Sequence, residues 1–303
     1  MSSLATILEL ARHELDSLLR TRRVVVVAAL YLGLAILGGV IYVVITRYGE
    51  QTLLDAMQLR NGGPGEADQE NLRMAMREGH TKLTGWLAGA GDIEVVATAL
   101  RESLILPLFL WSSLAFLPFV IIATSFDHIT NDLQVRSLCY SILRAHRAEI
   151  VLGKFAAHTL VFVLLTAVSS LVLVTVAGLS LESSDLASEL GGLPRVWLVL
   201  LPFGMCYLAI SSFCSAANKQ TTPALLSAFA VIILLRVVGA LDNMPVESDW
   251  RFLHHLSWLS PATHQAGLWR ADWVDVLLST TAYGAFAVGF LVLATAVLSV
   301  RDL

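Results

Sequence analysis

The chain has 303 residues, of which 56% are hydrophobic and only 15% charged, and its mean hydropathy is +0.71. Soluble domains contain about 25% charged residues, so this composition excludes an ordinary soluble globular protein and predicts an integral membrane protein. The net charge of −4 provides no general attraction to nucleic acid, and no nucleic-acid partner is expected.

The first predicted element is an amphipathic helix over residues 4–20. Its apolar residues recur at helical spacing, and its charged residues fall mainly on the opposite face. The basic cluster Arg20, Arg22 and Arg23 follows directly. Residues 1–23 are therefore expected to form a cytoplasmic elbow helix at the membrane surface, with a solvated helix as the alternative. The apolar run that follows is too long for a signal peptide, so no cleaved leader is expected.

Apolar runs that could span a bilayer recur along the rest of the chain. A spanning helix needs about 20 residues, and each run reaches this length within the uncertainty of its ends. The fold class expected is an all-α integral membrane protein, with six transmembrane helices over residues 24–303. The spans expected are 24–46, 104–125, 150–179, 196–214, 223–241 and 274–300.

Lysine and arginine residues in the connections predict the orientation of these spans. The side with few cations has only Arg195, Arg251 and Arg270 in its short loops. The cations expected on the other side are Arg12, Arg20, Arg22, Arg23, Arg136, Arg144, Arg147, Lys219 and Arg301. Because cytoplasmic loops are enriched in Lys and Arg, both termini are predicted to be cytoplasmic.

Two long loops are expected on the extracytoplasmic side, besides the short one that contains Arg195. The first, 47–103, has plausible helices at Thr52–Arg60, at Asp68–Glu78 and from Asp92. It is too short for a confident independent domain, so it is expected to pack on membrane lipid or on an extracytoplasmic partner. The second, Asp242–Asp272, is expected to form an interfacial or re-entrant hairpin. Its histidines lack a completing ligand set and are interpreted as interfacial residues, with no metal site expected: His254, His255 and His264.

The polar interval Asp127–Lys154 separates the second and third spans. It contains a cluster of cations, and its leucine and isoleucine residues recur at roughly helical spacing. This pattern predicts an amphipathic helix over about 130–143 that offers a charged face to the cytosol. We interpret it as the place where a separate protein applies force to the spans.

Motifs of the common nucleotide- and metal-dependent enzymes are absent from the sequence. Gly153-Lys154 is followed by Phe155, and Ala148 stands where a P-loop needs glycine. His13-Glu14 does not continue into a second zinc-binding histidine. The chain is therefore expected to have no catalytic, cofactor or metal site of its own.

Arg236 lies inside the apolar run predicted as the fifth span. Charged residues within spans often mark transport pathways, but this one is close enough to the outer boundary to extend its guanidinium to water. Both interpretations, a pathway residue and an anchored or paired arginine, stay open.

The combination of these features resembles the permease subunits of type-2 ATP-binding-cassette (ABC) exporters. The interval between spans two and three matches the family pattern at Asp127, Ile129, Asp132, Ser137-Leu138, Arg147, Glu149 and Leu152-Gly153-Lys154. The Leu259–Pro261 stretch and the last span are also similar to the family. The chain departs from the pattern at Asp132, where Glu is usual, at Arg136, where Gly is common, and at residues 144–146, where a proline turn is usual.

The resemblance implies a coupling helix between spans two and three. The residues implied to contact the ATPase are Asp132, Arg136, Ser137, Leu138, Arg147 and Glu149. The resemblance further implies two copies of a separate ATPase that bind ATP and Mg, and a second permease chain that completes a homodimer. Transport would then proceed by alternating access. The location implied is the cytoplasmic (inner) membrane of a bacterium or archaeon. Substrate identity is not specified. The alternatives are a secondary transporter or channel, an intramembrane enzyme, and a non-transporting membrane scaffold for an envelope complex.

Overall fold

The computed structural model of the chain describes residues 3–61, 105–135, 145–180, 186–241, 255–269 and 272–301. It is 92% helical and without strands over these residues, which confirms the all-α expectation. Six of its helices are long and apolar enough to cross a membrane. They are α2 (Arg22–Asn61), α5 (Ile105–Ser125), α8 (Arg147–Ser180), α9 (Leu186–Ala217), α10 (Thr221–Ala240) and α12 (Trp273–Val300).

Two of these helices extend well beyond the apolar runs from which they were predicted. The helix expected at Thr52–Arg60 is not separate from the first span but is the end of α2, which continues to Asn61. Helix α9 begins at Leu186, before the apolar run, and includes Pro194. Apolarity marks where a helix meets lipid, whereas the helix itself continues while propensity and packing favour it. The helices expected after Asp68 and Asp92 lie outside the described residues.

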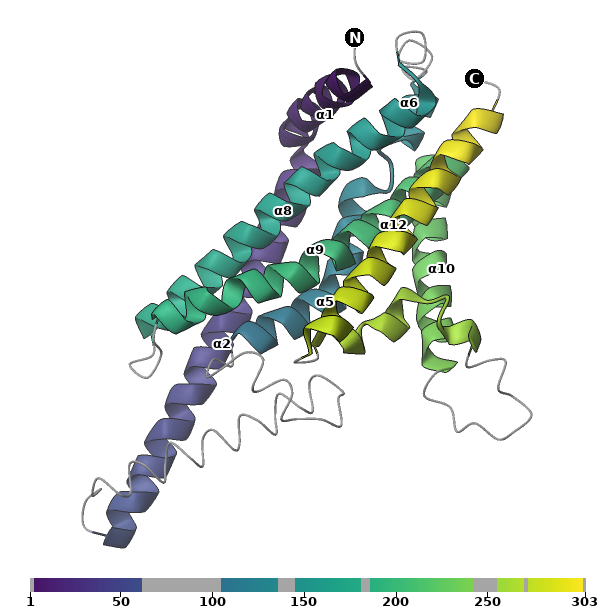
Figure 1. Cartoon of the computed structure of the whole chain (residues 1–303). Coiled ribbons are helices and arrows are strands. Elements are labelled where there is room, and N and C mark those ends of the chain that lie inside the picture. The colour runs from purple at the N-terminus through teal and green to yellow at the C-terminus, as the bar shows by residue number, and fades with distance from the viewer. Residues whose placement is uncertain are drawn as a thin grey trace.

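The first helix and the two chain termini lie at the same end of the bundle. Figure 1 shows α1 (Ser3–Arg20), the short helix α6 (Thr130–Gln134) and the C-terminal end of α12 together at this end. The amphipathic helix predicted at 4–20 is thus present and packs along α8. The positive-inside argument predicts that this end faces the cytoplasm.

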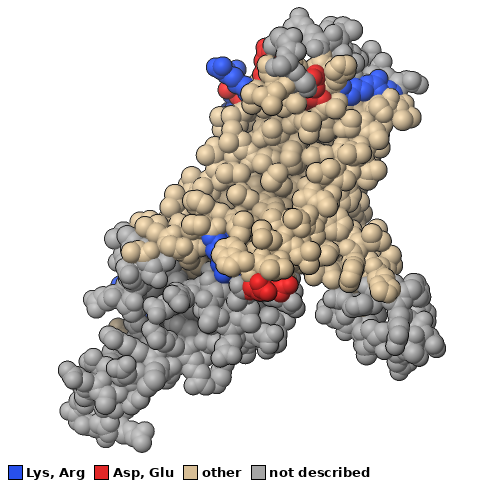
Figure 2. All heavy atoms as spheres, viewed as in Figure 1, with Lys and Arg blue, Asp and Glu red and all other residues tan. Residues whose placement is uncertain are grey.

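Charged side chains are concentrated toward the two ends of the molecule. On the face shown in Figure 2, Lys, Arg, Asp and Glu cluster around the end that contains α1 and α6, with a smaller group near the other end. The surface between these groups contains none of these four residue types in that view. An apolar band bounded by charge is the surface that a spanning protein presents to lipid.

Helix α9 lies at the centre of the bundle. In its most apolar stretch 67% of the residues are buried, compared with 17% in α2. The Phe203 ring packs against Tyr207, with ring centroids 4.7 Å apart, and against Tyr283 of α12, at 5.7 Å. Cys206 and Cys214 are buried free thiols on the same helix, as expected. The core of the bundle is therefore built around α9.

Residues 255–269 fold back onto the bundle and do not cross it. They include two short 3₁₀ helices, η3 (Pro261–His264) and η4 (Ala266–Trp269). The Ser260 hydroxyl accepts a hydrogen bond from the Ala262 amide at 3.1 Å and donates to the Leu235 carbonyl of α10 at 2.6 Å. Gly239 allows this approach, because a Cβ there would lie 2.8 Å from that of Ala262. The Leu-Ser-Pro motif thus caps η3 and fastens it to α10.

Candidate functional site

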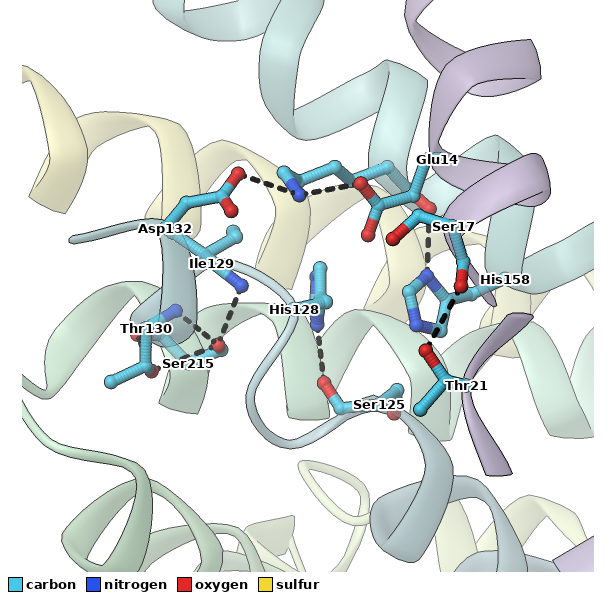
Figure 3. Close-up of polar contacts among 11 residues, drawn as sticks. Glu14, Ser17, Thr21, Ser125, His128, Ile129, Thr130, Asp132, His158 and Ser215 are labelled. Carbon is cyan, nitrogen blue, oxygen red and sulfur yellow. Dashed lines mark hydrogen bonds and ion pairs between the residues drawn. The ribbon is translucent and has the colours of Figure 1, made fainter. Parts of the chain in front are cut away.

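The turn from α5 into α6 is fixed to the central helix by serine hydroxyls (Figure 3). Ser125 donates to the Ser211 hydroxyl of α9 at 2.8 Å. One turn further along α9, the Ser215 hydroxyl accepts hydrogen bonds from the amides of Ile129 and Thr130, each at 3.0 Å. The Thr130 hydroxyl donates to the Ser215 carbonyl at 2.7 Å. Since these groups are buried, the start of α6 is attached to α9 through satisfied polar contacts.

Lys154 joins three helices near this turn. Its ammonium lies 2.7 Å from the Glu14 carboxylate of α1 and 2.9 Å from the Asp132 carboxylate of α6. Lys154 is only 7% exposed. A buried charge is tolerated when it is paired and hydrogen-bonded, and the two carboxylates satisfy this need. The lysine, itself in α8, therefore connects α1 to α6.

Gly153 explains how α1 approaches α8 so closely. A Cβ at this position would lie 2.8 Å from the Leu10 Cβ and 3.3 Å from the Ile7 carbonyl oxygen, both in α1. Only glycine leaves room for this crossing, as in other closely packed membrane helices. In the Leu152-Gly153-Lys154 motif, the glycine thus brings α1 near and the lysine pairs with its carboxylate.

Two buried histidines lie beneath the lysine. The rings of His128, in the α5–α6 turn, and His158, in α8, have centroids 4.8 Å apart. His158 Nδ1 bonds the Lys154 carbonyl at 3.0 Å, and His128 Nδ1 bonds the Ser125 carbonyl. Because a carbonyl can only accept, both Nδ1 atoms are donors. Within the described residues neither Nε2 atom has a hydrogen-bond partner. We call Glu14, His128, Asp132, Lys154 and His158 the polar junction.

Arg147 and Glu149 have partners within the chain. The Arg147 guanidinium donates to the carbonyls of Leu298, at 2.7 Å, and Ser299, at the C-terminal end of α12. A cation at a helix C-terminus is favoured by the helix dipole. The Glu149 carboxylate accepts the His146 amide at 2.9 Å, which caps the start of α8. These contacts hold Arg147 against the end of α12 and Glu149 at the start of α8, and contact with an ATPase remains a prediction for both.

The remaining predicted site residues fall into two groups. Arg136, Ser137 and Leu138 lie outside the described residues, so the helix expected over 130–143 is seen only as Thr130–Gln134. Arg236 lies near the C-terminal end of α10, away from the polar junction. Its guanidinium donates a hydrogen bond to the Leu114 carbonyl of α5 at 3.5 Å. The structure therefore does not bring Arg236 together with the residues predicted to contact an ATPase.

Sequence reasoning did not identify Glu14, His158, Ser211 or Ser215 as parts of one site. A signal existed for Lys154, because a cation seven residues inside a helix that continues as an apolar span needs a counter-charge. Nothing in the sequence indicates that the counter-charge comes from a helix 140 positions earlier. The serines resemble ordinary small residues that permit helix packing.

A known protein family matches nearly the whole chain. A family model described as "ABC-2 family transporter protein" matches residues 8–300. No curated protein matches the sequence. The match includes α1 from residue 8 onward, α6, the polar junction and the six helices long enough to span a membrane.

Proposed function

Because this chain belongs to the ABC-2 family of transporter proteins and is a multi-pass membrane permease component of an ABC transporter, we propose that it is an exporter permease driven by a separate ATPase docked on α6. The observation that supports this most directly is the double ion pair of Lys154, which links the proposed docking helix to two further helices. Family membership implies an ABC ATPase partner.

The docking surface proposed is the end of the bundle where α6 lies. Asp132 is partly accessible there, with 29% of its side chain exposed, and Val135, which follows α6, is 70% exposed. Both side chains are thus accessible to the partner in this proposal. Arg136, Ser137 and Leu138 continue this surface in our proposal, and Arg147 and Glu149 border it.

The proposed transmission of force follows from the attachments of α6. When the ATPases bind ATP and Mg²⁺ and close, they displace α6, which is bonded to α9 through Ser215 and to α8 through Lys154. The Glu14 contact extends the same displacement to α1. Closely packed helices move as rigid bodies and not by continuous deformation. The spans therefore tilt together, which opens the pathway alternately to the two sides of the membrane.

In this proposal the working unit contains two permease chains and two ATPases in a bacterial or archaeal cytoplasmic membrane, with the α6 end in the cytoplasm. The concentration of cations on the α6 side supports that orientation. The substrate pathway lies between the two permeases, and Arg236, exposed on α10, is the charged residue proposed to border it.

Isolation of the complex tests this function. The affinity-tagged full chain is purified from native membranes in a mild detergent, and co-purifying chains are identified by mass spectrometry. We expect a P-loop ATPase in equimolar amount, with ATP hydrolysis that rises when the complex is reconstituted in lipid. If the tagged chain purifies without an ATPase, also after cross-linking in the membrane, and moves substrate in its absence, the chain is a secondary transporter instead.

A further inference from the structure

A pocket of about 300 Å³ lies between α2, α5 and α8, remote from the polar junction. Its walls are almost entirely apolar and include Leu34, Gly38 and Ile41 on α2 and Ile105, Phe109 and Phe116 on α5. An apolar cavity of about 150 Å³ already binds a small hydrocarbon, and ligand sites begin at about 300 Å³. The pocket is thus large enough to hold an apolar ligand.

The position of the pocket along the spans limits what can enter it. Its α2 wall runs from Tyr31 to Ile41, which at 1.5 Å per residue extends from about 10 to about 25 Å beyond Val24, where the apolar run begins. The hydrocarbon core of a bilayer is about 30 Å thick. The whole pocket therefore lies at the depth of lipid tails, and its length of about 15 Å suits an extended chain.

The outer rim of the pocket faces lipid. Leu37 is 55% exposed, Ile41 50% and Phe116 49%. Helix α2 is the least buried of the spanning helices. A ligand can therefore enter sideways from the bilayer, without passing through a charged end of the bundle.

One polar group is available inside the pocket. The hydroxyls of Tyr31 and Ser113 are hydrogen-bonded to each other at 2.8 Å, and both are buried. The two hydroxyls thus satisfy each other, and the pair leaves the wall compatible with an aliphatic chain.

From these observations we propose that the pocket binds one acyl chain of a membrane glycerophospholipid, inserted laterally between α2 and α5. Depth, length and apolar lining select an aliphatic chain, and the surrounding bilayer supplies it at high concentration. The Tyr31–Ser113 pair lies about 10 Å inside the span, where it contacts the chain itself and not the phosphate headgroup. This site does not depend on the proposed ATPase coupling, since it uses none of the coupling residues.

Gly38 provides a way to close the pocket without disturbing the fold. It lines the pocket, and a Cβ added there would meet no atom within 4 Å. Gly33 on the same helix is equally open, but it is not part of the lining. Gly38→Leu and Gly33→Leu are therefore a matched pair, in which both raise helix propensity and only the first fills the pocket.

The test uses the full chain in nanodiscs that contain phosphatidylcholine with a diazirine in the middle of one acyl chain. After irradiation, labelled residues are identified by mass spectrometry. We expect strong labelling of Phe109 and Ser112, falling about tenfold in Gly38→Leu and unchanged in Gly33→Leu. Labelling of Val292, which is 61% exposed on α12, should be the same in all samples. Ser112→Leu, on the opposite wall, repeats the closure if Gly38→Leu does not fold.

Two results would overturn the proposal. Equal labelling of Phe109 and Val292, unaffected by Gly38→Leu, would show that only the lipid surrounding every spanning helix was labelled. Absence of label in the pocket, together with loss of a dimer in Gly38→Leu by native mass spectrometry, would show that a second copy of the chain fills it.

Discussion

The ammonium of Lys154 lies 2.9 Å from the carboxylate of Asp132, and this contact ties the short helix α6 to the long spanning helix α8. The same ammonium holds Glu14 of α1 at 2.7 Å. One buried side chain therefore connects the proposed docking helix to both α8 and α1.

Lys154→Met removes the charge that both carboxylates share. Breaking a buried ion pair by removing one partner costs about 3–5 kcal/mol, so we expect a clear fall in unfolding temperature and loss of permease-stimulated ATP hydrolysis. Asp132→Asn should cost less, because Glu14 still pairs with the lysine. Thermal unfolding in detergent, followed by tryptophan fluorescence, measures both variants.

The matched control is Lys219→Met, which removes an exposed lysine and should change the unfolding temperature little. A double-mutant cycle of Lys154→Met with Asp132→Asn should give a coupling energy of about 0.5–3 kcal/mol. Additive effects would mean that the two residues do not act as a pair.

Gly153→Ala should separate α1 from α8. The added methyl would lie 2.8 Å from the Leu10 Cβ and 3.3 Å from a backbone carbonyl, which cannot move aside easily. Overpacking of this kind typically costs about 1–3 kcal/mol, more than the gain in helix propensity of about 1 kcal/mol. Gly284→Ala, where no atom lies within 4 Å, should be neutral or stabilising. If both variants unfold alike, α1 does not pack closely on α8.

Ser215→Ala should loosen the start of α6. It leaves the buried amides of Ile129 and Thr130 without the hydroxyl that they share, and an unsatisfied buried donor costs about 1–3 kcal/mol. Hydrogen exchange should become faster at these two amides. Ser212→Ala is the control, because the Ser212 hydroxyl only donates to the Leu208 carbonyl within α9. Unchanged exchange in Ser215→Ala would mean that this hydroxyl does not hold the start of α6.

The spanning helices were predictable from the sequence because each must cover its backbone polar groups within a long apolar run. Their ends were less predictable. Helix α2 continues to Asn61 through polar residues that hydropathy excludes, and α9 starts at Leu186, before the span predicted from 196, and includes Pro194. Polar residues in α2 and a proline near the start of α9 therefore reduce contact with the membrane, but they do not end the helix.

The candidate site was only partly predictable. The motif around Asp132 and Lys154 marks the correct region, since charges beside an apolar run need partners. The Glu14 pairing and the Ser215 contacts depend on packing between segments 140 and about 85 residues apart, and no local pattern encodes such pairs.

Arg236→Leu separates stability from transport. The hydrogen bond from Arg236 to the Leu114 carbonyl is long, at 3.5 Å, and the guanidinium also bonds the Tyr207 side chain of α9. Losing one such contact from an exposed residue costs about 0.5–1.5 kcal/mol, so we expect normal expression and an unfolding temperature within about 4 °C of the parent. Loss of permease-stimulated ATP hydrolysis in this stable variant would assign Arg236 to the pathway. Full activity would leave it an anchoring residue at the membrane boundary.

The central claim, that an ATPase docks at the α6 end, is tested most directly by cysteine cross-linking. Val135 follows α6 and is 70% exposed, while Val274, at the other end of α12, is 69% exposed. In a Cys139→Ala background, each valine is replaced by cysteine and coupled to the co-expressed P-loop ATPase with a thiol–amine cross-linker. We predict a permease–ATPase product for Val135→Cys and none for Val274→Cys. A product from Val274→Cys alone would contradict docking at α6.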